Sequence, residues 1–296
     1  MFKFKKYEVG MTGLMPSPPD NRDIALSSVS PTIKRYPEAF PPPFDLTISN
    51  QKNKPHCVGF SCATIKQAQE FREQENVVFN GDEIYAECKK IDGIPNFNGT
   101  YLRVGMKVLQ KVGANSGGKN YKIASYARVD DISFEGLKKA ITLHGELLAG
   151  FTGSNQGWAR EIIRPPKAGE ATWKHAVALI GFEKNYIIGQ NSWGKEAHNN
   201  GIFKVPANYL PFEAWTTLDK PNTHAEPIKT GWVASEFLTL SGGQLKVNAK
   251  VGLRVRTTPK ILPNNTIEIL PFGTVIQLTN NEPVKDIQYN WVEVIV

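Results

Sequence analysis

Apolar positions along the chain change their spacing between its first and second halves. Residues 57–74 lack proline and have a mostly apolar first half, which indicates a partly buried helix. The same reasoning predicts helices over residues 82–90, 102–111 and 134–143, and Gly113 is placed to stop the third of these four helices. The first part of the folded region is therefore expected to be helical.

Short apolar runs replace the helical pattern after these segments. Residues 147–151, 176–182, 186–189 and 202–205 are strand-sized and separated by glycine and asparagine turns. Helices followed by strands are typical of an α+β domain, so we expect a domain with a helical half and a sheet half.

Composition divides the chain into four parts. Residues 1–44 are rich in proline, serine and charge, which predicts an extended arm without regular helix that lies on the next domain. The α+β domain is expected over residues 45–221, and residues 222–242 have the composition of a linker. Residues 243–296 alternate like strands without a helix signal, which predicts a small β-barrel.

Size and charge set broad limits on the function. The chain has 296 residues, 41% of them hydrophobic, which is enough for two domains with real cores. Its net charge of +7 is spread along the chain, so we expect a solvated surface and no nucleic-acid partner. The longest apolar stretches are strand-sized, which argues against a membrane span.

The first six residues are basic, but the apolar block of a signal peptide does not follow them. The expected location is therefore cytoplasmic or virion-associated, with release by lysis as a further route.

Cysteine chemistry is the first candidate for a reactive group. Three cysteines cannot form a disulfide framework, and at least one must stay free. Cys57 follows Pro55 at the expected start of a helix, where the helix macrodipole is expected to lower the thiol pKa. Cys62 is five residues further and points about 140° away on the same helix. We therefore predict that Cys57 is the nucleophile and that Cys62 and Cys88 fill the core.

One of five histidines is suited to act as the base for this thiol. His175 alone begins an apolar strand, which is a rigid platform for an imidazole ring. Asn191 follows sixteen residues later, and its amide oxygen is expected to fix the orientation and tautomer of that ring. Trp193 is expected to keep water out, and Gln51 is a candidate donor for a developing oxyanion.

These residues lie in strings that resemble papain-like cysteine peptidases. Residues 175–181 and 190–194 are similar to the family's His and Asn blocks, and the spacing of Gln51 and Cys57 matches its oxyanion-hole glutamine and nucleophile. The stretch from residue 57 to residue 63 resembles the prokaryotic and viral branch.

This resemblance implies a two-lobed fold with a helical lobe and a β-barrel lobe. It also implies a thiol-dependent endopeptidase that acts on proteins or peptides through Cys57, His175 and Asn191, with Gln51 in the oxyanion hole. It implies substrate contacts at Gly99 and Trp193 and no metal or cofactor.

The chain also departs from the family pattern. A half-cystine is missing before Cys57, and Val58 replaces the usual tryptophan, so the family's disulfides are not expected. The 56 residues before Cys57 are expected to hold only a short arm that blocks the cleft.

A second resemblance concerns the C-terminal part. Residues 247–259 are similar to the opening of a bacterial SH3-like domain, and residues 272–276 and 290–294 fit its turn and final strand. Such domains bind cell-wall peptides or other proteins, which implies one of these as ligand.

Two other functions remain open from the sequence. The first is a phage or bacterial peptidoglycan endopeptidase anchored to the cell wall by the SH3-like domain, and the second is a non-catalytic structural or binding protein on the same scaffold. Nucleotide binding is not expected, because Asn120 replaces the Ser or Thr of a phosphate-binding loop in residues 113–120 and a helix precedes the string.

Overall fold

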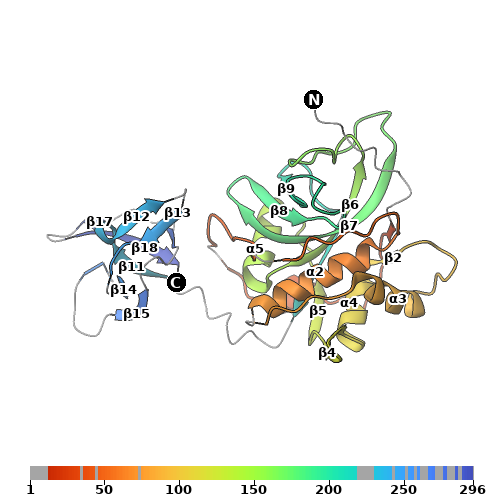
Figure 1. Ribbon diagram of the computed structural model, residues 1–296, viewed down its shortest axis with the longest axis horizontal. Coiled ribbons are helices and arrows are strands. Elements are labelled where there is room, and N and C mark those ends of the chain that lie inside the picture. Colours follow the sequence, from red (N-terminus) through yellow and green to blue (C-terminus); the bar gives the residue numbers. More distant parts are fainter. Residues whose placement is uncertain are drawn as a thin grey trace. The chain divides into compact units, whose positions relative to one another are not determined.

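The computed structural model divides the chain into two compact units, Met1–Lys220 and Pro221–Val296 (Figure 1). In the first unit the structure describes residues 13–33, 36–43, 46–72 and 75–218. In the second unit it describes residues 230–241, 244–250, 253–256, 259–260, 266–270, 276–278, 284–285 and 289–295.

The described residues of the first unit contain five helices. They are α1 Leu26–Val29, α2 Cys57–Arg72, α3 Gly81–Ile91, α4 Leu102–Lys111 and α5 Phe134–His144. The structure confirms the four helices expected from residue 57 onward, with ends within two residues of the expected ones. The expectation of an arm without regular helix was wrong at α1, because residues 20–30 contain no proline and a short helix can form there. No helix among the described residues has the length and apolar character needed to cross a bilayer.

Local side chains explain where these helices begin and end. The side chain of Asn80 accepts a hydrogen bond from the backbone N–H of Asp82 and caps α3, and Ser133 caps α5 in the same way. Gly113 has a φ of 89° and donates its N–H to the carbonyl of Val108, which closes α4.

Six strands form the main sheet in the order β5-β10-β6-β7-β8-β9, and all neighbours are antiparallel. Their bounds are β5 Ser125–Arg128, β6 Leu147–Ser154, β7 Thr172–Glu183, β8 Tyr186–Gln190, β9 Ile202–Pro206 and β10 Glu213–Leu218. The four expected strands are confirmed as β6 to β9. Within the described residues no pairing joins β5 to β9, so the sheet is open where the resemblance implied a barrel.

Two small pairs of strands complete the first unit. β1 Leu14–Met15 in the arm pairs in parallel with β2 Thr100–Tyr101. β3 Ala114–Ser116 and β4 Lys119–Tyr121 form a hairpin whose turn is Gly117-Gly118. The glycine-rich string over residues 113–120 is therefore a helix cap followed by a hairpin.

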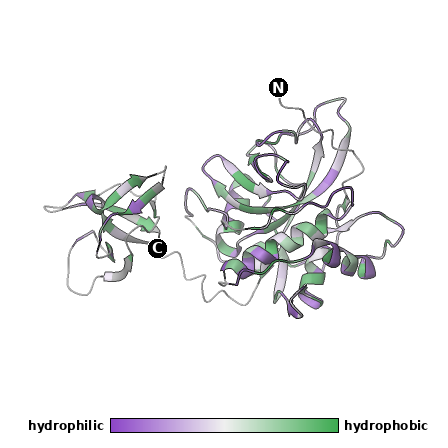
Figure 2. Cartoon of the chain, viewed as in Figure 1, coloured by the Kyte–Doolittle hydropathy of each residue, from purple (hydrophilic) through white to green (hydrophobic). Residues whose placement is uncertain are grey.

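Strand β7 separates two hydrophobic cores. Ala176 and Ala178 face the core that contains α2 and α4, whereas Val177 and Leu179 face the core that contains α5. A bulge between Leu179 and Gly181 shifts this alternation by one residue. Figure 2 shows hydrophobic residues along the central strands and hydrophilic residues along α3 at the surface. Burial of both faces of β7 fixes its register.

The second unit consists of short strands. They are β11 Thr230–Ala234, β12 Leu238–Ser241, β13 Gln244–Val247, β14 Leu253–Arg256, β15 Thr266–Leu270, β16 Gln277–Leu278, β17 Val284–Lys285 and β18 Asn290–Ile295, with the 3₁₀ helix η2 Ser235–Phe237. One sheet has the order β15-β14-β11-β18-β16, with β17 also paired to β18, and β12 pairs with β13. Val233, Val255 and Val294 are buried in the core of this unit.

The range expected to be a linker, residues 222–242, contains β11 and β12. β11 pairs with β18 over five residues and buries Val233, so this part of the range belongs to the folded unit. Of the turn expected over residues 272–276, positions 272–275 lie outside the described residues.

Candidate active site

Cys57 is the first residue of α2 and is fully buried. Burial raises the pKa of the Cys57 thiol, while hydrogen bonds from the backbone of Ala176, Gly13 and Val58 oppose this rise. The expectation that the start of the helix would give a lowered pKa is therefore wrong for this state of the molecule, because the loss of hydration outweighs the helix amides. Cys57 lies directly against the residue that follows His175.

His175 and Asn191 form a buried hydrogen-bonded pair. The distance from His175 Nε2 to Asn191 Oδ1 is 2.8 Å, and the backbone N–H of Ser192 donates to the same oxygen at 2.8 Å. Among the residues that the structure describes, His175 Nδ1 has no hydrogen-bond partner. Burial lowers the pKa of His175 to about 4, although the hydrogen bond to Asn191 acts in the opposite direction. The imidazole is therefore neutral in this state.

Indole rings enclose the imidazole. Trp193 stacks on His175 with 4.7 Å between ring centroids, and Trp158 and Trp173 approach it edge-on at 5.9 and 6.0 Å. Trp193 thus packs on the imidazole, and its expected role in keeping water out stays a prediction. Its expected contact with substrate stays a prediction.

Gln51 is buried beside the same segment. Its backbone N–H donates to the carbonyl of Ser192 at 2.8 Å, and its Oε1 accepts from the Ser192 hydroxyl at 2.5 Å. Gln51 Nε2 donates to the carbonyl of Lys54 at 2.7 Å. A carbonyl can only accept, so these contacts identify the nitrogen end of the side chain. Ser192 therefore connects Gln51 to the segment that holds Asn191.

Gly99 precedes the short strand β2 and has a φ of 143°, which favours glycine. The Lys89 ammonium donates to the carbonyls of Ile94, Phe97 and Gly99 at 2.9, 2.9 and 3.0 Å, and to Asp92 Oδ2 at 2.6 Å. This single cation organises the loop that leads to β2.

The N-terminal arm occupies the edge of β2. Thr100 donates its N–H to the carbonyl of Gly13 at 2.9 Å, and Leu14 pairs with Thr100. The Leu14 side chain packs into the core with Leu102 and Ala176 and is only 6% exposed. The arm thus lies against both Gly99 and Cys57.

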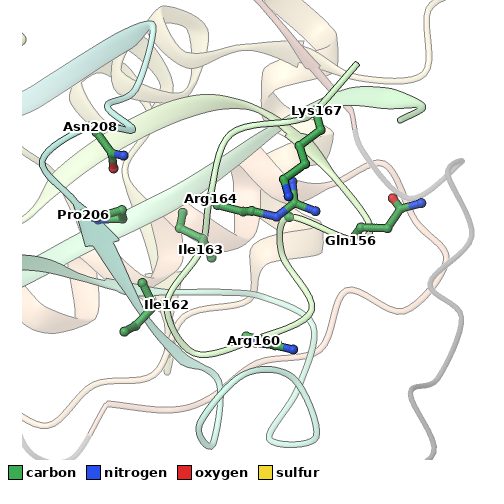
Figure 3. A pocket seen from close by; sticks show the side chains of 9 residues that line it. Gln156, Arg160, Ile162, Ile163, Arg164, Lys167, Pro206 and Asn208 are labelled. Carbon is green, nitrogen blue, oxygen red and sulfur yellow. The ribbon is translucent and has the colours of Figure 1, made fainter. Parts of the chain in front are cut away.

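A separate pocket of about 500 Å³ lies between the loop after β6 and the end of β9 (Figure 3). It is lined by Gln156, Gly157, Arg160, Ile162, Ile163, Arg164, Lys167, Pro206 and Asn208. Arg164 forms two hydrogen bonds with Glu170, at 2.5 and 3.0 Å, which neutralise part of its positive charge. None of the expected catalytic residues lines this pocket.

His198 is a site residue that sequence reasoning missed. Its Nε2 lies 2.8 Å from Asn191 Nδ2. Its position seven residues after Asn191 is the only trace of this contact in the sequence.

Comparisons with known proteins identify the family of the first unit. Residues 48–211 match the sequence model of the papain family cysteine protease. A peptidase C1-like protein of Acanthamoeba polyphaga mimivirus is 24% identical over 257 residues, which cover 68% of this chain and 83% of that protein. Human cathepsin L2 is 22% identical over 190 residues, which cover 53% of this chain and 56% of cathepsin L2.

Solved structures show the same fold. Xylellain, a cysteine protease from Xylella fastidiosa, has a TM-score of 0.62 at 22% identity, and the match covers 74% of this chain and all of xylellain. A cysteine protease from Carica candamarcensis has a TM-score of 0.51 at 15% identity, covering 62% of this chain and all of that protease.

Acidification is expected to destabilise the fold through His175. Its pKa is about 4 in the folded chain and about 6.5 when unfolded, so the unfolded state binds more protons in between. The stabilisation is complete above pH 6.5 and is lost as the pH falls through 4; between pH 7 and pH 5 the loss is about 2 kcal/mol. Urea unfolding at both pH values should show a steeper loss in the wild type than in His175→Gln. Equal losses would contradict the buried neutral imidazole.

Displacing the arm is expected to expose the thiol. A Cβ at Gly13 would lie 2.0 Å from the carbonyl oxygen of Pro55, which as backbone cannot move aside. In Gly13→Val the arm should leave its place. Iodoacetamide should then alkylate Cys57 at least about tenfold faster, because a small decrease in the free energy of local opening is enough for such a change in rate. Gly117→Val, at an open hairpin turn, controls for backbone strain. An unchanged alkylation rate in a folded Gly13→Val protein would show that the arm does not cover the thiol.

Proposed function

Because the chain belongs to the papain family of cysteine proteases and is a cysteine-type peptidase, we propose that it is an endopeptidase whose nucleophile is Cys57. His175 is the proposed base, Asn191 its orienting partner and Gln51 a donor to the oxyanion. The observation that carries this proposal is the buried His175–Asn191 hydrogen bond of 2.8 Å, with Cys57 against the next residue, Ala176.

The proposed reaction proceeds through an acyl-enzyme. His175 Nδ1 takes the proton of Cys57 Sγ, and the sulfur then forms a bond to the carbonyl carbon of the substrate. Gln51 Nε2 and the backbone N–H of Cys57 stabilise the negative oxygen. The C–N bond breaks as His175 returns the proton to the leaving amine, and water then hydrolyses the thioester.

Access of substrate to this site requires a change at the arm. Burial raises the pKa of Cys57 and lowers that of His175, so the covered state favours the neutral thiol and the neutral imidazole. Departure of the arm admits water and peptide together, which reduces the cost of the thiolate–imidazolium pair. The arm residues Gly13 and Leu14 therefore compete with substrate for the edge of β2.

Replacing the nucleophile tests this function most simply. Cys57→Ala should lower peptide hydrolysis by about 10⁴-fold or more, because the residues of such a site act as one unit. It should also abolish labelling by an epoxysuccinyl inhibitor. Cys62→Ala is the matched control, since Cys62 is equally buried in the same helix but lies next to Gly105 of α4. Retained labelling of Cys57→Ala would refute the assignment.

The second unit is proposed to be an SH3-like binding domain for cell-wall peptides or another protein. The support is its short antiparallel strands around a core of Val233, Val255 and Val294, together with the resemblance of residues 247–259. With a cell-wall ligand, the substrate of the first unit would be peptidoglycan.

Purified sacculi and casein separate the two substrate classes. The full chain and a variant ending at residue 220 are incubated with each substrate. Loss of sacculus cleavage but not of casein cleavage in the shortened chain supports a wall-directed domain. Casein cleavage by both proteins without any action on sacculi supports a protein substrate and refutes the peptidoglycan alternative.

A further inference from the structure

His198 is placed between the candidate catalytic residues and the backbone of a distant loop. Its Nε2 is 2.8 Å from Asn191 Nδ2, and its Nδ1 is 2.9 Å from the carbonyl oxygen of Arg160. The ring stacks on Trp193 with 5.9 Å between centroids and an angle of 17°. It also lies 5.2 Å from the ring of Phe203. The imidazole is therefore held in one orientation.

Two backbone groups, the Arg160 carbonyl and the Ser192 N–H, fix the direction of the hydrogen bonds that His198 and Asn191 form. The Arg160 carbonyl can only accept, so His198 Nδ1 carries a proton and Nε2 has the lone pair of the neutral ring. That lone pair accepts from the Asn191 amide nitrogen. At the other end, the backbone N–H of Ser192 can only donate, so it selects the Asn191 oxygen. The Asn191 amide is thus held from both sides and cannot flip.

The orientation of the Asn191 amide also determines which ring nitrogen of His175 carries the proton. Asn191 Oδ1 can only accept, so His175 Nε2 must donate to it over their 2.8 Å contact. In the neutral ring Nδ1 is then the unprotonated nitrogen, and it is the nitrogen without a hydrogen-bond partner among the described residues. A base that accepts the thiol proton of Cys57 needs this tautomer.

We propose that His198 is a positioning residue for peptide-bond hydrolysis, which acts by holding the amide of Asn191. This inference rests on the catalytic roles proposed above for Cys57 and His175. Without His198, the amide nitrogen of the buried Asn191 loses its acceptor, and the amide gains rotamers that place its nitrogen toward His175. In these rotamers the amide nitrogen faces His175 Nε2, and it cannot accept a hydrogen bond.

The proposal predicts a change in the titration of His175. Its hydrogen bond to Asn191 raises the pKa of His175, so a loosened amide should lower that pKa further. The titratable group that acts on the pKa of His175 is His198, whose charge lowers it, and the rings of Trp158, Trp173 and Trp193 pack against the imidazole. Replacing His198 by Phe or by Gln removes that charge in both cases, so the difference between the two variants reports the Asn191 amide. The imidazolium of the active ion pair would then lose its proton at a lower pH.

The test uses two substitutions in the full chain. His198→Phe keeps an aromatic ring beside Trp193 but removes both hydrogen bonds, whereas His198→Gln keeps an acceptor and a donor in one side-chain amide. His198→Phe should lower kcat about tenfold with little change in KM, because the interaction acts on the chemical step. The alkaline limb of its kcat/KM profile should move to lower pH, and His198→Gln should restore most of both properties.

His144→Phe is the matched control. His144 is another histidine whose pKa is lowered by burial, but its ring bonds to Ser30 at the end of α5. It should leave kcat and the pH profile unchanged. Melting temperatures of all variants report any general loss of folding.

Several outcomes would overturn the positioning role. Wild-type kcat and an unmoved alkaline limb in His198→Phe would do so, as would equal losses in His198→Phe and His198→Gln that follow their melting temperatures. Cys57→Ala is assayed in parallel. If it is inactive while His198→Phe is unaffected, only the positioning role fails; if it stays active, the proposed catalytic function fails as well.

Discussion

Strand β7 buries both of its faces, and the candidate site depends on this constraint. Its even-numbered residues Ala176 and Ala178 pack toward α2, and its odd-numbered residues Val177 and Leu179 pack toward α5. A slip of one residue would exchange the two sets and bury them in the wrong cores. The register therefore fixes His175 among the indole rings and, one residue on, Ala176 against Cys57 at the start of α2. Neighbouring β8 ends at Gln190 and delivers Asn191 to the imidazole.

Loss of hydration has a larger effect on the pKa values of Cys57 and His175 than the hydrogen bonds that these two side chains receive. Cys57 begins a helix and receives backbone hydrogen bonds, yet burial raises its pKa. Burial likewise outweighs the Asn191 hydrogen bond at His175. Both effects disfavour charge in this structure, where the arm lies against the thiol. On the proposed mechanism, the reactive state would therefore differ from this one in solvation as well as in access.

Much of the fold could be predicted from the sequence because the main helices have clear boundaries. α4 spans the expected residues 102–111, where Gly113 supplies the stop signal. β10 escaped prediction because it lacks alternation: Glu213, Thr216 and Thr217 are buried although they are polar. Glu213 is satisfied by the indole N–H of Trp215 at 2.6 Å, a contact that no local pattern reveals.

The candidate site likewise contains residues that could be predicted from the sequence and one that could not. Cys57, His175, Asn191 and Gln51 could be selected because their spacing along the chain resembles a known family. His198 could not, since its contact with Asn191 depends on a loop that turns back through the positive φ values of 51° at His198 and 54° at Asn200. Nothing in the sequence indicates that the Arg160 carbonyl closes this network from another loop. Such a role follows only from the direction of hydrogen bonds in space.

The central claim is that two backbone groups, the Ser192 N–H and the Arg160 carbonyl, fix the protons on both histidines through Asn191. Nitrogen NMR of the full chain labelled in its histidine rings measures these tautomers directly at neutral pH. The account predicts a protonated Nε2 and an unprotonated Nδ1 at His175, and the reverse at His198. A protonated Nδ1 at His175 in the neutral ring would contradict it.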